Sequence, residues 1–322
     1  MPIKENNLYK NPKNSKTESV VKLKKTMKKI AFLILFLTQL FGFSQDIKVI
    51  DSTTKLPIQY ATIKVLKEGV PKIGIYTDEN GSFNLTPANY NEQLIVSCVG
   101  YETKTVTLTK NETSIELEKE INNLKEVIIL NNKKPIQIGY IDEKKCKDKV
   151  GVSAGLEVAV FIANSFDYEV QINAVQFKIK KSKERVAYRL HLYTISENGL
   201  SPNEDLILEN SIYYIEPKTE GLIEINVSNL NLTLPKNGVF VGIEGIGGEI
   251  TSTPMSNYNN LKFEAHQSTL PIYQERYLLN KVGWVNMNKW LPQNYYDSFK
   301  LIYDPERLYV PSFGLKVSRI IN

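Results

Sequence analysis

The sequence predicts an all-β protein made of an N-terminal antiparallel sandwich and a second, jelly-roll-like β-sandwich. Three observations lead to this prediction. Apolar and polar residues alternate along many short segments, turn-forming residues separate these segments, and residues 150–322 contain no helix-period stretch of comparable length. With 322 residues, 42% of them hydrophobic and 23% charged, the chain has an ordinary globular composition and room for about two domains.

The N-terminus has the residue order of a secretory signal peptide. Lysines precede an apolar run over residues 30–43, and Gly42 and Ser44 occupy the small-residue positions before a cleavage site. We expect residues 1–44 to be removed, with Gln45 as the mature N-terminus and Met27 as the true start. The alternative is an uncleaved membrane helix, although the run is shorter than the ~20 residues that cross a bilayer.

Removal of this segment changes the charge of the chain. Residues 1–44 hold nine lysines and two acids, a net charge of +7, so the net charge falls from +5 to −2. The mature chain therefore gives no reason to expect a nucleic-acid partner, which requires a basic surface on the folded protein. We expect an exported protein of the periplasm, outer-membrane periphery or cell surface, without a transmembrane span in its mature form.

Strand patterns begin directly after residue 45. Ala61, Ile63 and Val65 point to one face and Thr62 and Lys64 to the other, which is the period of a half-buried strand. Turn-forming stretches follow at short intervals, as in a sandwich. One of them, Asp78-Glu-Asn-Gly, is a hairpin signal; it lacks the spaced oxygen ligands of a calcium loop.

Four motifs stand in order within this region: Ile47-Lys-Val-Ile-Asp, Leu56-Pro-Ile-Gln-Tyr-Ala-Thr-Ile, Thr77-Asp-Glu-Asn-Gly-Ser-Phe and Val96-Ser-Cys-Val-Gly-Tyr-Glu. Together they resemble the carboxypeptidase-regulatory-like domain of Bacteroidetes proteins. The resemblance covers residues 45–120 and implies a transthyretin-like sandwich that often precedes outer-membrane receptors or other exported modules. In the family a glycine usually precedes the first motif. It is absent here, so the resemblance is weakest at this edge strand.

The family name does not imply peptidase chemistry, because this domain is the accessory part and carries no zinc. The chain has two histidines, His191 and His266, and neither stands in a zinc-binding motif. We expect no metal site and no cofactor. Tyr188, Leu190 and Leu192 share one face of a predicted strand, and His191 lies with Arg189 on the opposite face. This alternation predicts that His191 is a solvent-exposed strand histidine.

Residues 121–149 are predicted to be a strand followed by a lysine-rich linker, because the pattern after Ile121 is strand-like and the charged stretch after Asn131 is not. In residues 150–322 the strand period returns. Val175, Phe177 and Ile179 alternate with polar residues, and the same occurs over residues 223–227 and 313–317. These patterns predict the second sandwich.

The string Gly151-Val-Ser-Ala-Gly matches the nucleophile elbow of hydrolases, in which the serine follows a buried strand and precedes a helix. Here a charged stretch precedes Ser153 and a strand-like segment follows it, so a loop entering a strand is the better interpretation.

Cys98 lies in an apolar strand and Cys146 in a charged stretch. We expect two unpaired thiols, Cys98 buried, although an exported protein could form a disulfide.

Aromatic residues are dense between residues 273 and 303, interleaved with Asn, Gln and Lys. They can form a surface for a glycan or a protein partner, or they can fill the sandwich core. The candidate surface residues are Tyr273, Tyr277, Trp284, Trp290, Tyr295 and Tyr296.

No complete catalytic constellation is visible, so we expect an exported cell-envelope protein with a non-catalytic binding or scaffolding role and no catalytic residues. One alternative is an envelope hydrolase of glycan or peptide with its site in residues 150–322. It would require Ser, Asp, Glu and His side chains to converge in one cleft. The other alternative is a purely structural spacer.

Overall fold

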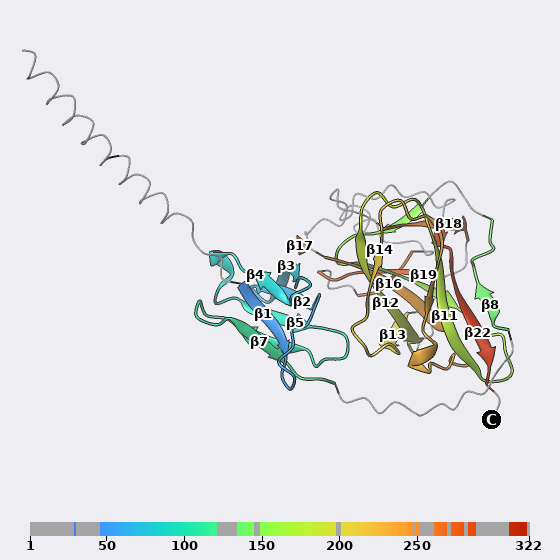
Figure 1. The fold of residues 1–322 in the computed structure, drawn as a ribbon, viewed down its shortest axis with the longest axis horizontal. Helices are drawn as coiled ribbons and strands as arrows, with labels where there is room; N and C mark the ends of the chain where they lie inside the picture. The colour runs from blue at the N-terminus through green and yellow to red at the C-terminus, as the bar shows by residue number, and fades with distance from the viewer. Residues whose placement is uncertain are drawn as a thin grey trace, which may run out of the picture. The chain divides into compact units, whose positions relative to one another are not determined.

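The computed structural model describes residues 29, 46–120, 134–144, 149–197, 201–247, 249–250, 261–268, 272–279, 283–287 and 309–320. Residues 46–322 form one compact unit, and the regular secondary structure of its described part consists of β-strands and two 3-10 turns at Pro87–Asn89 and Ser228–Leu230 (Figure 1). The predicted all-β fold is confirmed. No helix in the described part of the chain is long and apolar enough to cross a membrane.

The first module is a sandwich of a three-stranded and a five-stranded sheet, ordered β4-β1-β7 and β17-β3-β2-β5-β6. Its own strands are β1 (Asp46–Asp51), β2 (Thr62–Lys67), β3 (Val70–Tyr76), β4 (Ser82–Asn84), β5 (Gln93–Ser97), β6 (Lys104–Thr107) and β7 (Ser114–Leu117). The pairs are antiparallel except β1–β7, which is parallel. That pair departs from the expected antiparallel sandwich because the chain crosses from β6 in one sheet to β7 in the other.

The alternation predicted along β2 is confirmed, since Ala61, Ile63 and Val65 are fully buried in the core between the two sheets. The turn before β4 is not the predicted hairpin, because it joins β3 of one sheet to β4 of the other, and β4 pairs with β1. Asp78 accepts hydrogen bonds from the backbone N–H groups of Asn80 and Ser82 at 2.8 Å each. Gly81 has φ +69°, and a Cβ there would lie 2.8 Å from Pro57, so this position requires glycine.

The second module contains two seven-stranded sheets over one core. One sheet holds β10 (Leu156–Ile162), β12 (Val186–Ile195), β13 (Pro202–Asp205), β14 (Ile212–Ile215), β16 (Val239–Ile246), β19 (Tyr273–Tyr277) and β20 (Val285–Asn286). The other holds β8 (Ile136–Gly139), β9 (Lys149–Val152), β11 (Val170–Ile179), β15 (Gly221–Asn226), β18 (Leu261–Gln267), β21 (Tyr309–Pro311) and β22 (Phe313–Arg319). The core is centred on Phe177, Phe263 and Phe313, whose ring centroids lie 4.9–5.9 Å apart.

The predicted linker is shorter than expected. β8 pairs with β22 and β9 pairs with β18, so parts of residues 131–149 belong to the second sandwich. Ile136 and Ile138 alternate over too few residues to stand out from the lysines around them. Gly139 makes the close pairing possible, since a Cβ there would lie 2.8 Å from the backbone of Gly314.

The two modules share a sheet and a small apolar core. β17 (Glu249–Ile250) follows the second module's β16 but pairs with β3 of the first module. Tyr60 and Tyr76 of the first module pack with Ile246 and Tyr277 of the second, all four side chains being buried. This boundary lies against the sheet that carries the charged residues described next.

Candidate functional site

A row of four charged side chains crosses the sheet β12-β16-β10-β19 in register. Arg189 is paired with Glu244, Glu244 with Glu157, and Glu157 with Arg276. Residues in register on adjacent strands have side chains on the same face, so the strand order itself places the four charges side by side. We call Arg189, Glu244, Glu157 and Arg276 the charge row.

The outer members of the charge row neutralise the inner ones. Arg189 Nη1 donates to Glu244 Oε2 at 2.6 Å, and Arg276 donates to Glu157 Oε2 from Nη2 at 2.5 Å and from Nε at 3.2 Å. Glu157 is 0% exposed, and the side chains of Glu244 and Arg189 are 5% and 4% exposed. Charges this deeply buried persist in a fold only when they are paired and hydrogen-bonded.

His191 lies between the two glutamates. Its Nε2 is 3.2 Å from Glu244 Oε2 and 4.0 Å from Glu157 Oε1, and its Nδ1 is 2.6 Å from Asp205 Oδ2. Gly242, the residue in register with His191, leaves the room for this arrangement. A Cβ at Gly242 would lie 3.0 Å from Glu157 Oε1 and 3.1 Å from His191 Cβ.

Two tyrosines complete the hydrogen bonding of the glutamates. Tyr76, from β3 of the first module, donates to Glu244 Oε1 at 2.7 Å. Tyr193 donates to Glu157 Oε1 at the same distance. Burial and the adjacent carboxylates raise the pKa of both phenols well above its ordinary value, so they act as hydrogen-bond donors at neutral pH.

The carboxylates determine the charge of His191. Burial by itself lowers the pKa of this imidazole, but Glu157, Asp205 and Glu244 outweigh burial and raise the pKa to about 10. Conversely, Arg189 and His191 outweigh the effect of burial on Glu244 and hold its pKa well below the ordinary value. At neutral pH His191 is a cation that donates from both ring nitrogens, and three cations face three carboxylates.

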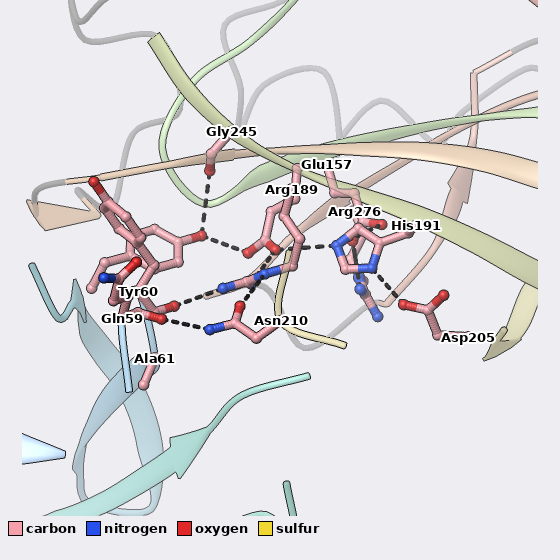
Figure 2. A network of polar contacts seen from close by, with 12 residues as sticks. Gln59, Tyr60, Ala61, Glu157, Arg189, His191, Asp205, Asn210, Gly245 and Arg276 are labelled. Atoms are coloured by element: carbon pink, nitrogen blue, oxygen red, sulfur yellow. Dashed lines mark hydrogen bonds and ion pairs between the residues drawn. The ribbon is translucent and has the colours of Figure 1, made fainter. Parts of the chain in front are cut away.

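Arg189 also connects the charge row to the first module. Its Nη2 donates to the backbone carbonyl oxygen of Tyr60 at 2.8 Å, and its Nε donates to Asn210 Oδ1 at 3.1 Å (Figure 2). Asn210 in turn donates to the carbonyl oxygen of Gln59 at 2.8 Å. One guanidinium therefore binds a carboxylate of its own sheet and the backbone of the neighbouring module.

A second, more exposed group of contacts lies at the edge of the same boundary. Glu79 of the first module accepts from Tyr214 at 3.1 Å and from Arg185 and Tyr60 at 3.3 Å each. The Arg185 guanidinium lies 3.7 Å from the centroid of the Tyr214 ring. Exposed pairs of this kind contribute little to stability individually, so the charge row is the stronger polar contact between the modules.

The arrangement contains the residue types of an acid–base site, but these side chains use their hydrogen-bonding groups on one another. Glu157, Glu244, Asp205 and His191 all bind each other or the two arginines, and none of the contacts described includes a serine, threonine or cysteine nucleophile. In the part of the chain that the structure describes, no three His, Cys, Asp or Glu side chains are grouped to hold a metal ion.

The expectation of a solvent-exposed His191 is wrong. His191 and Arg189 do lie opposite Tyr188, Leu190 and Leu192, which are in the core as predicted. However, His191 and Arg189 are each only 3% exposed, because the second face of this sheet is covered as well. The signal in the sequence was the placing of Glu157, Arg189 and Glu244 inside otherwise apolar strands, because a charge in a covered strand is costly unless it has partners.

The candidate aromatic surface is only partly described. Tyr273 and Tyr277 are 3% and 6% exposed and belong to the cores. Trp284 is half-buried, with the Arg276 guanidinium 4.6 Å from its ring centroid and the Tyr193 ring edge-on at 5.5 Å. Trp290, Tyr295 and Tyr296 lie outside the described residues.

The remaining candidates are structural. Ser153 lies between β9 and β10, so strands stand on both sides of it and the strand–turn–helix of a nucleophile elbow is not formed. Cys98 is free and buried as predicted, and burial raises the pKa of its thiol to about 11, which makes it unreactive. Cys146 lies outside the described residues.

Comparison with known families identifies the first module. Residues 48–129 match the model of the CarboxypepD_reg-like domain, which confirms the resemblance seen in the motifs. No curated protein matches the chain.

Among solved structures, the chain resembles the cysteine protease and lectin-like domains of Cwp84, a surface layer associated protein of Clostridium difficile. The identity is 10%, the TM-score is 0.35, and the match covers 86% of this chain and 63% of that one. A second structure of the clostridial cysteine protease Cwp84, after propeptide cleavage, gives 9% identity, a TM-score of 0.35, and coverage of 86% and 70%.

Proposed function

We propose that this chain is an exported, non-catalytic protein of the cell envelope, in which the CarboxypepD_reg-like domain and the second sandwich act as one rigid binding or scaffolding unit. The observation that carries the proposal is the use of the charge row. Its carboxylates and cations are bound to one another, and Arg189 extends the network to the carbonyl oxygen of Tyr60 in the first module.

This use of charge differs from that of an active site. A general acid or base must reach substrate with a free lone pair or proton, whereas Glu157 and Glu244 each accept from a tyrosine and an arginine. Buried networks that are fully satisfied make a fold rigid and specific. A fixed angle between two sandwiches suits a protein that presents a surface to a partner or spaces its neighbours.

Chemical denaturation tests the rigid unit. We expect the parent protein to unfold in one transition, because both sandwiches and the charge row that connects them are lost together. An Arg189→Met variant keeps an unbranched side chain at this position but loses the three hydrogen bonds to Asn210, Glu244 and Tyr60, and it should separate the transition into two. Lys183→Met, on a nearby exposed turn, is the control and should leave one transition. Two transitions already in the parent would exclude a single unit.

The hydrolase alternative is tested in parallel with chromogenic esters, peptides, glycosides and peptidoglycan fragments. We expect no turnover by the parent. Turnover that disappears in a folded His191→Asn variant would overturn the non-catalytic proposal and assign the charge row to catalysis.

Export is tested separately, by fractionating cells and reading the N-terminal residue of the mature protein, which we expect to be Gln45.

A further inference from the structure

A segment that we call the strap, residues 140–142, follows β8 and crosses the sheet that contains β11, β18 and β22. Tyr140 N–H donates to the carbonyl oxygen of Phe313 at 2.7 Å. The Lys178 ammonium group donates to the carbonyl oxygen of Ile141 at 2.5 Å. A Cβ at Gly314 would lie 2.6 Å from Ile141 Cγ1. Because Gly314 follows the core residue Phe313, this Cβ would point away from the core, and the strap therefore covers the outer face of the sheet.

The strap meets β18 at His266. The His266 ring stacks on the ring of Tyr140, with the centroids 5.3 Å apart and the planes 23° from parallel. The histidine is 4% exposed, and its Nδ1 is buried without a hydrogen-bond partner among the described residues. Its neighbour in register, Val310, is fully buried and apolar, so that position offers no acceptor.

This environment suits the neutral form of the imidazole. Protonation gives the ring an N–H group at both nitrogens, and the one at Nδ1 would be buried without an acceptor. A buried charge or donor that has no partner is costly. Burial accordingly lowers the pKa of His266, and the Glu143 carboxylate opposes burial without outweighing it.

The charged groups around His266 leave it without an anion at Nδ1. Asp142 is bound by Gln137 at 2.7 Å, and Glu143, the residue after the strap, is exposed. Burial raises the pKa of Tyr140, so its phenol is uncharged at neutral and acidic pH. The titratable side chains on the elements packed around the ring are Lys262 and Glu264 of β18, Tyr140, Asp142, Glu143 and Lys144 in and beside the strap, Lys178 of β11 and Tyr309 of β21.

We propose that His266 is an acid-sensitive switch for the strap. At neutral pH the uncharged ring packs against Tyr140 and residues 140–142 lie on the sheet. Protonation places a charge in a buried position, and release of the strap lets water and the exposed Glu143 carboxylate compensate that charge. The sheet stays folded, because its core lies on the other face. The inference goes beyond the proposed function, since it concerns a conformational change that requires no ligand or partner.

Two measurements on the full chain test the switch. The sequence contains two histidines, so NMR of the imidazole nitrogens can follow both rings. We expect His266 to become protonated only below about pH 6.5, the value of an unperturbed histidine, while His191 stays protonated. Over the same range, the amide protection factor of Tyr140 should fall about tenfold. The amides of β12 should keep their protection, which distinguishes release of the strap from acid unfolding.

Two variants separate the titration of His266 from its packing. His266→Phe keeps a ring against Tyr140 but cannot be protonated, so the strap should remain protected at acidic as well as neutral pH. Tyr140→Ala removes the stacked ring, and the strap amides should exchange rapidly at both pH values.

Three results would overturn the inference. They are an equal protection factor of the strap in the parent at about pH 7 and pH 5, an acid response that persists in a folded His266→Phe variant, or protonation of His266 in the parent without loss of strap protection. The parent measurements stand even where a variant does not fold. None of these outcomes involves turnover of a substrate or separate unfolding of the modules, which are the results that contradict the proposed function.

Discussion

Arg189 of the second module donates to the backbone carbonyl oxygen of Tyr60 in the first module at 2.8 Å. Tyr60 has φ +51°, a left-handed conformation that non-glycine residues adopt at an energetic cost and that persists where surrounding contacts hold it. At this position the backbone bends so that the carbonyl faces the guanidinium. The contact thus depends on the conformation of the first module more than on the identity of side chain 60, and it requires both modules to be folded.

Replacing Glu244 by glutamine removes the charge that neutralises Arg189 and His191 in a buried position. We expect the free energy of unfolding to fall by roughly 3–5 kcal/mol, the usual cost of leaving a buried charge without its partner. Urea denaturation measures the change. The matched control is Glu224→Gln, whose bond to Lys316 is between side chains 40% and 34% exposed and should be worth no more than ~1 kcal/mol. Equal effects of the two substitutions would contradict the assigned role of Glu244.

Gly100 lies where the first module contacts the loop after β13. Its φ is +79°, and a Cβ there would lie 2.2 Å from the carbonyl oxygen of Leu208, so Gly100→Ala introduces both backbone strain and a collision with the second module. Gly69→Ala is a suitable control, because Gly69 has φ +71° and no atom within 4 Å of its Cβ position.

We expect Gly69→Ala to cost about 1 kcal/mol from backbone strain alone, and Gly100→Ala to cost at least ~2 kcal/mol more because packed backbone must move. Differential scanning calorimetry gives both values. If the two glycine variants melt at the same temperature, the contact between Gly100 and Leu208 is not tight.

Tyr76→Phe tests the hydrogen bond between the modules without changing the shape of the side chain. The loss of the hydroxyl leaves Glu244 Oε1 without its donor, which should lower the free energy of unfolding by about 1–3 kcal/mol. Amide hydrogen exchange should rise in β3 and β17, which meet beside Tyr76. Tyr90→Phe serves as the control, since Tyr90 packs against the core of the first module and forms none of the contacts with Glu244 described above. Unchanged exchange in β3 would argue against the contact.

The strands could be predicted from sequence because their evidence is local. The alternation around Val175 and Phe177, and around Ile63 and Val65, records which face of each strand is buried, and the motifs from Ile47 to Glu102 identified the first sandwich. Ile136 and Ile138 were missed because four residues are too few for the period to show within a charged stretch.

The charge row could not be predicted because its members come from four strands. Glu157, Arg189, Glu244 and Arg276 become neighbours only when the strand order β12-β16-β10-β19 and its register are known. Alternation showed correctly that His191 and Arg189 share a face, but it could not show that the face is covered. A single strand pattern distinguishes one face from the other; it does not distinguish solvent from a second module.

The pH dependence of stability tests the charge of His191. Its pKa is raised to about 10 in the folded protein from about 6.5 in an unfolded chain, so between these values the folded state binds the extra proton. The contribution of His191 to the stability of the folded protein is complete below about pH 6.5 and is lost as the pH rises through 10, at no more than about 1.4 kcal/mol per pH unit.

Because lysines and tyrosines also titrate in this range, the parent must be compared with His191→Gln, which should lose less stability between pH 7 and 10. His266→Gln is the control: burial lowers the pKa of His266, so its effect appears as the pH falls and the alkaline slope should equal that of the parent. If His191→Gln retains the full alkaline slope, His191 is neutral in the fold, and the balance of three cations with three carboxylates does not hold.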